Sequence, residues 1–156
     1  MKLKQTIISK NKKAFFSYSI SNYFLCGIQL NGSEIKSIRS GQVNISDSFC
    51  IISNQEVWIK NMDIAKYQFC NQEEYNPTRL RKLLLNKLEI KKIQKQLNEK
   101  GMTLIPTKLL ISEKGFAKIE VGLGKGKKTY DKRESLKKRD ATLEIERKKK
   151  GEINSP

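Results

Sequence analysis

Alternating apolar and polar residues, or short apolar runs between turn residues, recur along the chain, and both patterns are typical of β-strands. Six segments show one of these patterns: 14–20, 23–30, 48–53, 56–62, 102–111 and 116–123. Turn-forming residues separate the members of each successive pair: Ser21-Asn22, Asn54-Gln55 and Glu113-Lys114-Gly115. The pattern therefore predicts six short strands arranged as three hairpins.

A short helix is predicted between the second and third strands. Ser33 is placed to cap its start, Ile35 and Ile38 lie three residues apart, and Gly41 ends it. The polar face of this helix carries Glu34, Lys36 and Arg39. These residues could form a binding surface, but a solvated helix face explains them equally well.

A longer helical stretch is predicted over residues 79–101, after the break at Asn76-Pro77-Thr78. Its apolar stripe consists of Leu80, Leu83, Leu84, Leu88, Ile90, Ile93 and Leu97. The remaining surface is basic: Arg79, Arg81, Lys82, Lys87, Lys91, Lys92 and Lys95. The spacing slips near Asn86, which indicates two helices or a bend, and the net charge of the basic face favours a polyanion.

The order of elements predicts the fold class. About six short, mostly antiparallel strands with two or three inserted helices close most readily into a small barrel, so we expect a mainly β protein with an OB-type barrel. A chain of 156 residues suffices for one domain. We expect this domain to occupy residues 1–124 and a basic C-terminal tail, too rich in charge to build a core, to occupy residues 125–156.

The charge of the chain points to a polyanionic partner. The sequence has 32 basic and 16 acidic residues, a formal net charge of +16, with basic blocks at 1–20, 79–100 and 121–156. Nucleic acid is the leading candidate, because a basic surface gains affinity for it by counterion release. An anionic membrane is the rival, but no run approaches the roughly 18 apolar residues of a spanning helix. The start also lacks a signal-peptide apolar region, so we expect a cytoplasmic protein with no membrane partner.

The sequence offers little that could support catalysis. It has no histidine, its three cysteines are widely spaced without a C-x-x-C pair, and Glu73-Glu74 is its only adjacent pair of carboxylates. The glycines of "VGLGKGKKT" fit neither a Walker loop nor a dinucleotide loop, and they indicate a flexible segment. We therefore predict no enzyme, metal or cofactor, and we expect the cysteines and Trp58 to be core residues.

Four strings of the sequence resemble, in order, the signature blocks of the SsrA-binding protein (SmpB) family. They are "NKKA" (11–14), "GSEIKSIRSGQVNISDSF" (32–49), "NPTRLRKLLLNKLEI" (76–90) and "GKGKKTYDKR" (124–133). The resemblance implies an OB-type barrel and a tail that is disordered in the free protein and helical in the empty message channel of the ribosome. One departure is Leu25, which stands where the family has an acidic residue.

The resemblance also implies a function without catalysis. The protein is expected to act in trans-translation, as an adaptor that binds the tRNA-like domain of transfer-messenger RNA and enters a stalled 70S ribosome. Its further contacts would be the decoding centre and message channel of the small subunit, and elongation factor Tu indirectly through the alanylated RNA. A monomer is expected.

The residues that the resemblance assigns to these contacts form two groups. The predicted RNA contacts are Asn11, Lys12, Lys13, Glu34, Lys36, Arg39, Lys125, Gly126, Lys127 and Lys128. The predicted ribosome contacts of the tail are Asp131, Lys132 and Arg133. Leu84 is expected to support the surface without reading RNA.

Two other classes of function remain open. A structural ribosomal protein or a general single-strand-binding OB module would show exposed aromatic residues on the barrel and would bind RNA without regard to its shape. A nuclease would need the clustered carboxylates that the sequence lacks.

Overall fold

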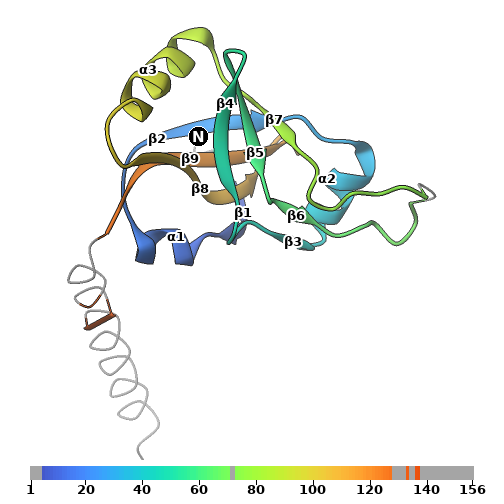
Figure 1. Cartoon of the computed structure of the whole chain (residues 1–156). Helices are drawn as coiled ribbons and strands as arrows, with labels where there is room; N and C mark the ends of the chain where they lie inside the picture. The colour runs from blue at the N-terminus through green and yellow to red at the C-terminus, as the bar shows by residue number, and fades with distance from the viewer. Residues whose placement is uncertain (1–4, 71–72, 128–132, 134–135, 138–156) are drawn as a thin grey trace, which may run out of the picture.

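The computed structural model of the chain describes residues 5–70, 73–127, 133, 136 and 137. Strands are the main elements of this part of the chain (Figure 1). They are β1 (Thr6–Lys10), β2 (Tyr18–Ile28), β3 (Val43–Asn44), β4 (Phe49–Ser53), β5 (Glu56–Lys60), β6 (Asp63–Ile64), β7 (Arg81–Leu84), β8 (Met102–Ile111) and β9 (Ala117–Gly126). The helices are α1 (Lys12–Ser17), α2 (Gly32–Arg39) and α3 (Lys87–Leu97).

The strand pairings close on themselves. The main sheet has the order β1-β8-β4-β5-β7-β2-β9, and β8 also pairs with β9, so six strands form a complete circuit with β1 added beside β8. All these pairings are antiparallel. The prediction of a mainly β, antiparallel fold of OB type with peripheral helices is confirmed.

The core fills the inside of this circuit with alternate residues of the strands. Its fully buried members include Val57 and Ile59 of β5, Leu104 of β8 and Ile119 of β9. None of the helices in the described part of the chain is long and apolar enough to cross a membrane.

The cysteines divide into two kinds. Cys26 and Cys50 are buried in the core, as predicted. Burial, with the charge of Glu89, raises the pKa of the Cys26 thiol to about 12, and burial also raises the pKa of Cys50. Cys70 is half-exposed, so its assignment to the core was wrong.

Three predicted elements agree with the structure. The β4–β5 hairpin turns at Asn54 and Gln55, which both have positive φ, and the β8–β9 connection turns at Gly115, where φ is +87°. The short helix after β2 is also present, although its N-cap is Asn31 and not Ser33. The N–H of Asn31 donates to Glu34 Oε1 at 2.8 Å and so closes the first turn.

The first predicted hairpin was wrong. Residues 12–17 form helix α1, because the Asn11 side chain accepts a hydrogen bond from the N–H of Ala14 and caps the helix. Ser21 and Asn22 do not end a strand. They lie at a bulge within β2, which pairs with β9 on both sides of them, and Asn22 takes a positive φ of 53° there.

The predicted helical stretch over 79–101 was also wrong in its first part. Residues 81–84 are strand β7, in which Arg81 and Leu83 point inward while Lys82 and Leu84 point outward. Only Lys87–Leu97 is helical, and Asn86 caps it by accepting from the N–H of Glu89 at 2.8 Å. The slip in spacing at Asn86 therefore marks a boundary between a strand and a helix.

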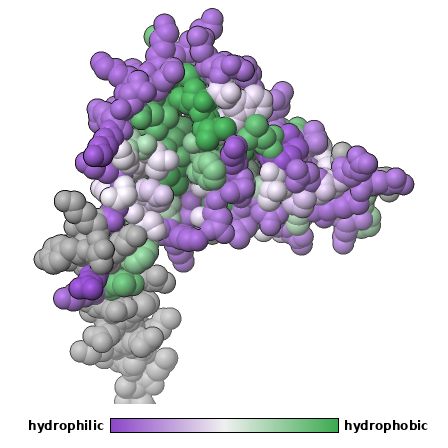
Figure 2. Space-filling model, viewed as in Figure 1, coloured by the Kyte–Doolittle hydropathy of each residue, from purple (hydrophilic) through white to green (hydrophobic). Residues whose placement is uncertain are grey.

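Trp58 lies on the outer face of the sheet, so its assignment to the core was wrong. It alternates with the buried Val57 and Ile59 along β5, and its direct cross-strand neighbours are Ile51 and Lys82. Figure 2 shows apolar side chains gathered over β4 and β5 and surrounded by hydrophilic ones. The rival class of single-strand-binding OB modules predicts aromatic residues at such a face.

The glycines of β9 have a packing role, and the segment is a regular strand. Gly122 is buried, and a Cβ there would lie 2.4 Å from Cγ2 of Ile20 on β2. The prediction of a flexible glycine and lysine segment was wrong up to Gly126, because this segment is a paired strand in which Gly122 and Gly124 leave room for neighbouring side chains.

Gly122→Ala is expected to lower the free energy of unfolding by about 1–3 kcal/mol, because the added methyl group must displace the branched Ile20 side chain. Urea unfolding would measure the loss. Gly126→Ala is the control, since a Cβ at that position meets no atom within 4 Å. Equal midpoints for the two variants would contradict the assigned close approach.

Candidate nucleic-acid interface

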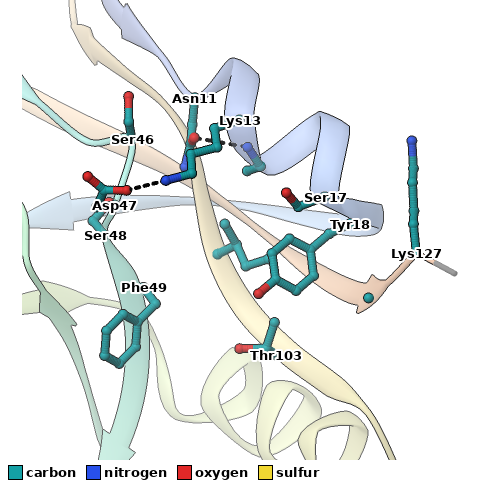
Figure 3. A pocket seen from close by; sticks show the side chains of 13 residues that line it. Asn11, Lys13, Ser17, Tyr18, Ser46, Asp47, Ser48, Phe49, Thr103 and Lys127 are labelled. Atoms are coloured by element: carbon teal, nitrogen blue, oxygen red, sulfur yellow. Dashed lines mark hydrogen bonds and ion pairs between the residues drawn. The ribbon is translucent and has the colours of Figure 1, made fainter. Parts of the chain in front are cut away.

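Two predicted RNA-binding segments, 11–13 and 125–127, meet at one end of the molecule. Tyr18, which follows α1, pairs with Gly126 of β9, and the N–H of Lys127 donates to the carbonyl of Ser17 at 2.9 Å. Between α1, the start of β4 and the end of β9 lies a hollow of about 590 Å³, which we call the α1 hollow (Figure 3). Its lining residues are Asn11, Lys13, Ala14, Ser17, Tyr18, Ser46, Asp47, Ser48, Phe49, Thr103, Ile105, Gly126 and Lys127.

Asn11 is buried at this end of the molecule, where its side chain bonds to several segments of the backbone. Its side chain is 1% exposed, and its Nδ2 donates to the carbonyls of Ile45 and Pro106 at 3.3 and 2.9 Å. Since its oxygen caps α1, the whole amide group is committed to the protein. The predicted RNA contact of Asn11 is untested, but in this structure its side chain positions α1 and the two lysines that follow.

Lys12 and Lys13 are both exposed on α1, and Lys125 and Gly126 are exposed on β9. Lys13 Nζ contacts Asp47 Oδ1 at 2.6 Å, and the hydrogen bond and charge of Asp47 raise the pKa of Lys13. Exposed pairs of this kind contribute little to stability, so a phosphate could take the place of the carboxylate at small cost. Asp47 is the rim residue of this interface that sequence reasoning missed.

Glu34 lies inside the protein, at the base of α2. Its side chain is 0% exposed and forms ion pairs with Arg79 and with Arg81, whose Nε lies 2.6 Å from Glu34 Oε2. Burial alone would raise the pKa of the Glu34 carboxyl, but the hydrogen bonds from Arg79, the Asn31 N–H and Arg81 together lower it. Glu34 is thus held as a carboxylate that ties α2 to β7.

Arg81 completes this buried cluster. It is also 0% exposed, and its guanidinium donates to the carbonyls of Met62 and Pro77 at 2.6 and 2.9 Å. The prediction that Arg81 belongs to an exposed basic face was wrong, because the inward side of β7 carries it. Sequence reasoning missed this role, although an arginine pair two residues apart in a lysine-rich chain was an available signal.

Lys36 and Arg39 are exposed on α2. Lys36 Nζ lies 5.6 Å from the ring centre of Tyr67, and Arg39 Nη2 donates to the Gly115 carbonyl at 3.0 Å. In Figure 1, α2 and the end of β9 lie at opposite sides of the molecule. The predicted RNA-binding residues therefore form two surfaces, one at the α1 hollow and one on α2.

The remaining predicted residues give less information. Lys128, Asp131 and Lys132 lie outside the described residues, while Arg133 is helical and exposed. Leu84 is half-exposed beside Gly27, and Leu25 lies directly opposite Glu120 of β9.

In the part of the chain that the structure describes, no group of three or more acidic, cysteine or histidine side chains could hold a metal ion.

Comparison with known families decides the assignment. The sequence model of the family described as "SmpB protein" matches residues 8–151, nearly the whole chain. The chain belongs to the SmpB family. Curated relatives in this family are named SsrA-binding protein. The one from Parabacteroides distasonis is 46% identical over 94% of this chain and 95% of its own length. The one from Bacillus velezensis is 51% identical over 90% of each chain.

A solved structure supports the SmpB fold of the chain. It is described as "tmRNA-SmpB: a journey to the center of the bacterial ribosome", and it matches with a TM-score of 0.67 at 36% identity. The match covers 82% of this chain and 93% of the solved one. The chain therefore shares its overall fold with that solved SmpB structure.

Proposed function

We propose that this SmpB-family chain binds transfer-messenger RNA and delivers it to stalled ribosomes in trans-translation. The observation that carries the proposal is the meeting of the "NKKA" segment (11–14) and the "GKGK" segment (124–127) around the α1 hollow, in a chain whose relatives are named for binding SsrA. Lys13 and Lys127 line this hollow, the exposed Lys12 and Lys125 lie close to them in the chain, and the phosphates of the tRNA-like domain would be their ligands. Recognition by shape and charge needs no catalytic group.

The chemistry of the basic residues favours backbone contact over base reading. The chain has 26 lysines against six arginines, and lysine acts on phosphate as a compact point charge where arginine forms planar bidentate contacts. An adaptor that makes and breaks no bond fits this composition. We therefore also propose that the protein is not an enzyme.

The ribosomal part of the proposal concerns the predicted tail, residues 125–156, in its part beyond the end of β9 at Gly126. We assign to this tail the empty message channel and the decoding centre of the small subunit, where it would fold as a helix once ribosomal RNA screens its charge. Residues 1–124, with the end of β9, would hold the RNA. The protein would work as a cytoplasmic monomer and would meet elongation factor Tu through the alanylated RNA.

A gel-shift titration tests the central claim. The protein is titrated with the tRNA-like domain of transfer-messenger RNA at physiological salt, against a large excess of ordinary tRNA and of single-stranded RNA. Survival of the complex is the expected result. Loss to either competitor would overturn selective recognition and would favour the general single-strand-binding class, to which the outward Trp58 gives some support.

Alanine at Asp131, Lys132 and Arg133 tests the division of labour. We expect nearly unchanged affinity for the tRNA-like domain and a loss of peptide tagging on stalled ribosomes, because the tail motif is assigned to the ribosome. The measurements are a gel shift and an in-vitro tagging assay with the same protein preparation. A parallel decrease in both readouts would contradict the assignment.

A further inference from the structure

The α1 hollow has aromatic walls that its lysines do not explain. Tyr18 at the start of β2 and Phe49 at the start of β4 both line it, and Figure 3 shows their rings standing along it. A Cβ at Gly124 would lie 3.1 Å from the Tyr18 Cβ, so Tyr18 packs closely against the backbone of β9. Phe49 keeps more than a third of its surface exposed. A hollow with rings held in this way suits a planar, aromatic ligand.

The rim of the hollow has charges of both signs. The Lys13–Asp47 pair lies on one side and Lys127 on the other, as Figure 3 shows. A lysine attracts a phosphate, whereas a carboxylate repels a phosphate and accepts hydrogen bonds from the amino group of a base. A ligand that carries a phosphate at one end and an amino-bearing ring at the other would satisfy both sides.

Hydroxyl groups complete the lining between these charges. Ser17, Ser46 and Thr103 contribute side chains that can both donate and accept. The Ser48 hydroxyl is committed, because it donates to the Ile45 carbonyl at 2.5 Å. The interior is thus apolar at the rings and polar at its margins, which is the pattern of a site for a nucleobase rather than for a lipid chain.

We propose that the α1 hollow receives one unstacked nucleobase of the bound RNA, stacked against Tyr18 and Phe49. The phosphate of that nucleotide lies toward Lys127, and an amino group of the base lies toward Asp47. This inference rests on the proposed function and deepens it, because it adds a stacking contact and a base preference to binding by charge.

The deciding experiment compares Tyr18→Leu/Phe49→Leu with Tyr23→Leu, which changes an exposed tyrosine in the bulge of the same strand. The affinity of the full chain for the tRNA-like domain is measured by fluorescence anisotropy at several salt concentrations. We expect the double variant to bind about 5- to 100-fold more weakly, with an unchanged salt slope, because stacking is lost and no charge is removed. Binding equal to that of Tyr23→Leu would overturn the proposal.

Folding must be separated from binding in this comparison. Phe49→Leu alone is the safer variant, because this ring is exposed, and we expect it to show the same direction of change with an unaltered unfolding midpoint. A selective wild-type complex together with unaffected Phe49→Leu and double variants would remove the base site and leave the proposed function intact. Failure of the wild-type protein to select the tRNA-like domain would instead reject the proposed function.

Mononucleotides test the base preference without the large RNA. In an NMR titration of the labelled full chain with CMP, UMP or ribose 5-phosphate, we expect CMP to shift the amides of Ser17, Thr103 and Gly126 at the lowest concentration. Cytosine presents an amino group to Asp47, whereas uracil presents a carbonyl. Asp47→Asn should remove the preference for CMP. Equal responses to the three probes would overturn base recognition, since they would show a phosphate site alone.

Discussion

Glu34→Leu is expected to lower the free energy of unfolding by about 3–5 kcal/mol. The reason is Arg81, which has 0% exposure and would keep its charge inside the protein without a counter-ion. Urea unfolding at neutral pH would measure the change. Because α2 loses its tie to β7, we expect the surface that carries Lys36 and Arg39 to loosen as well, which amide hydrogen exchange would report.

Two further variants sharpen this test. Glu56→Leu removes the half-exposed Lys82–Glu56 pair, for which we expect a loss of about 0–1 kcal/mol. Glu34→Leu combined with Arg81→Met removes both buried charges and should recover much of the stability lost by Glu34→Leu alone. The role of the buried pair would be rejected if Glu34→Leu were no more harmful than Glu56→Leu.

The pH dependence of stability should also show the contribution of the Glu34 carboxylate. The pKa of Glu34 is lower in the folded protein than in the unfolded chain, so its stabilising contribution is fully present above the unfolded pKa of about 4.3. That contribution is lost as the pH falls through the folded pKa. The stability difference between the wild type and Glu34→Leu should therefore be largest above about pH 5 and should shrink in more acidic solution.

Alanine at Lys12, Lys13, Lys125 and Lys127 together is expected to weaken binding of the tRNA-like domain by about two to three orders of magnitude at 0.15 M salt. Each phosphate contact contributes about 0.7–0.9 to the slope of log affinity against log salt, so the slope should fall by up to about 3–4. Lys13 should contribute the least of the four to affinity, because the wild-type protein must first break its ion pair with Asp47. Affinities measured from low to high salt give both quantities.

A matched variant removes the same charge elsewhere. Lys87, Lys91, Lys92 and Lys95 are exposed on α3, and their replacement by alanine changes the net charge of the protein by the same amount. We expect a much smaller loss of affinity and of slope in that variant. If the two variants weakened binding equally, the affinity would depend on overall charge and the assigned interface would be wrong.

The sequence predicted best those elements whose turns are local. The β4–β5 and β8–β9 hairpins depend on short connections with positive-φ residues, which sequence patterns indicate well. The prediction failed where a short apolar run fits both the helical period of 3.6 residues and the strand period of two. Leu80, Leu83 and Leu84 fit one face of a helix, but pairing of β7 with β2 and β5 makes this segment a strand.

The sequence predicted which residues belong to the candidate site, but it did not predict how they are arranged in space. Segments 11–13 and 125–127 are more than a hundred residues apart, and the pairings of β9 with β2 and β8 bring them together. Asn11 and Glu34 looked like surface residues because polar side chains are mostly exposed. Both are buried because they satisfy backbone and arginine groups that are themselves distant in the sequence.

The division among the cysteines gives the natural sequence a single position for chemical labelling. Thiol reagents need the thiolate, which burial suppresses at Cys26 and Cys50. Cys70 is half-exposed, and its N–H bonds to the carbonyl of Tyr67, the residue whose ring lies beneath Lys36. A maleimide dye on the unmutated protein would therefore stand beside the α2 surface, where it could follow the approach of RNA or ribosome in real time.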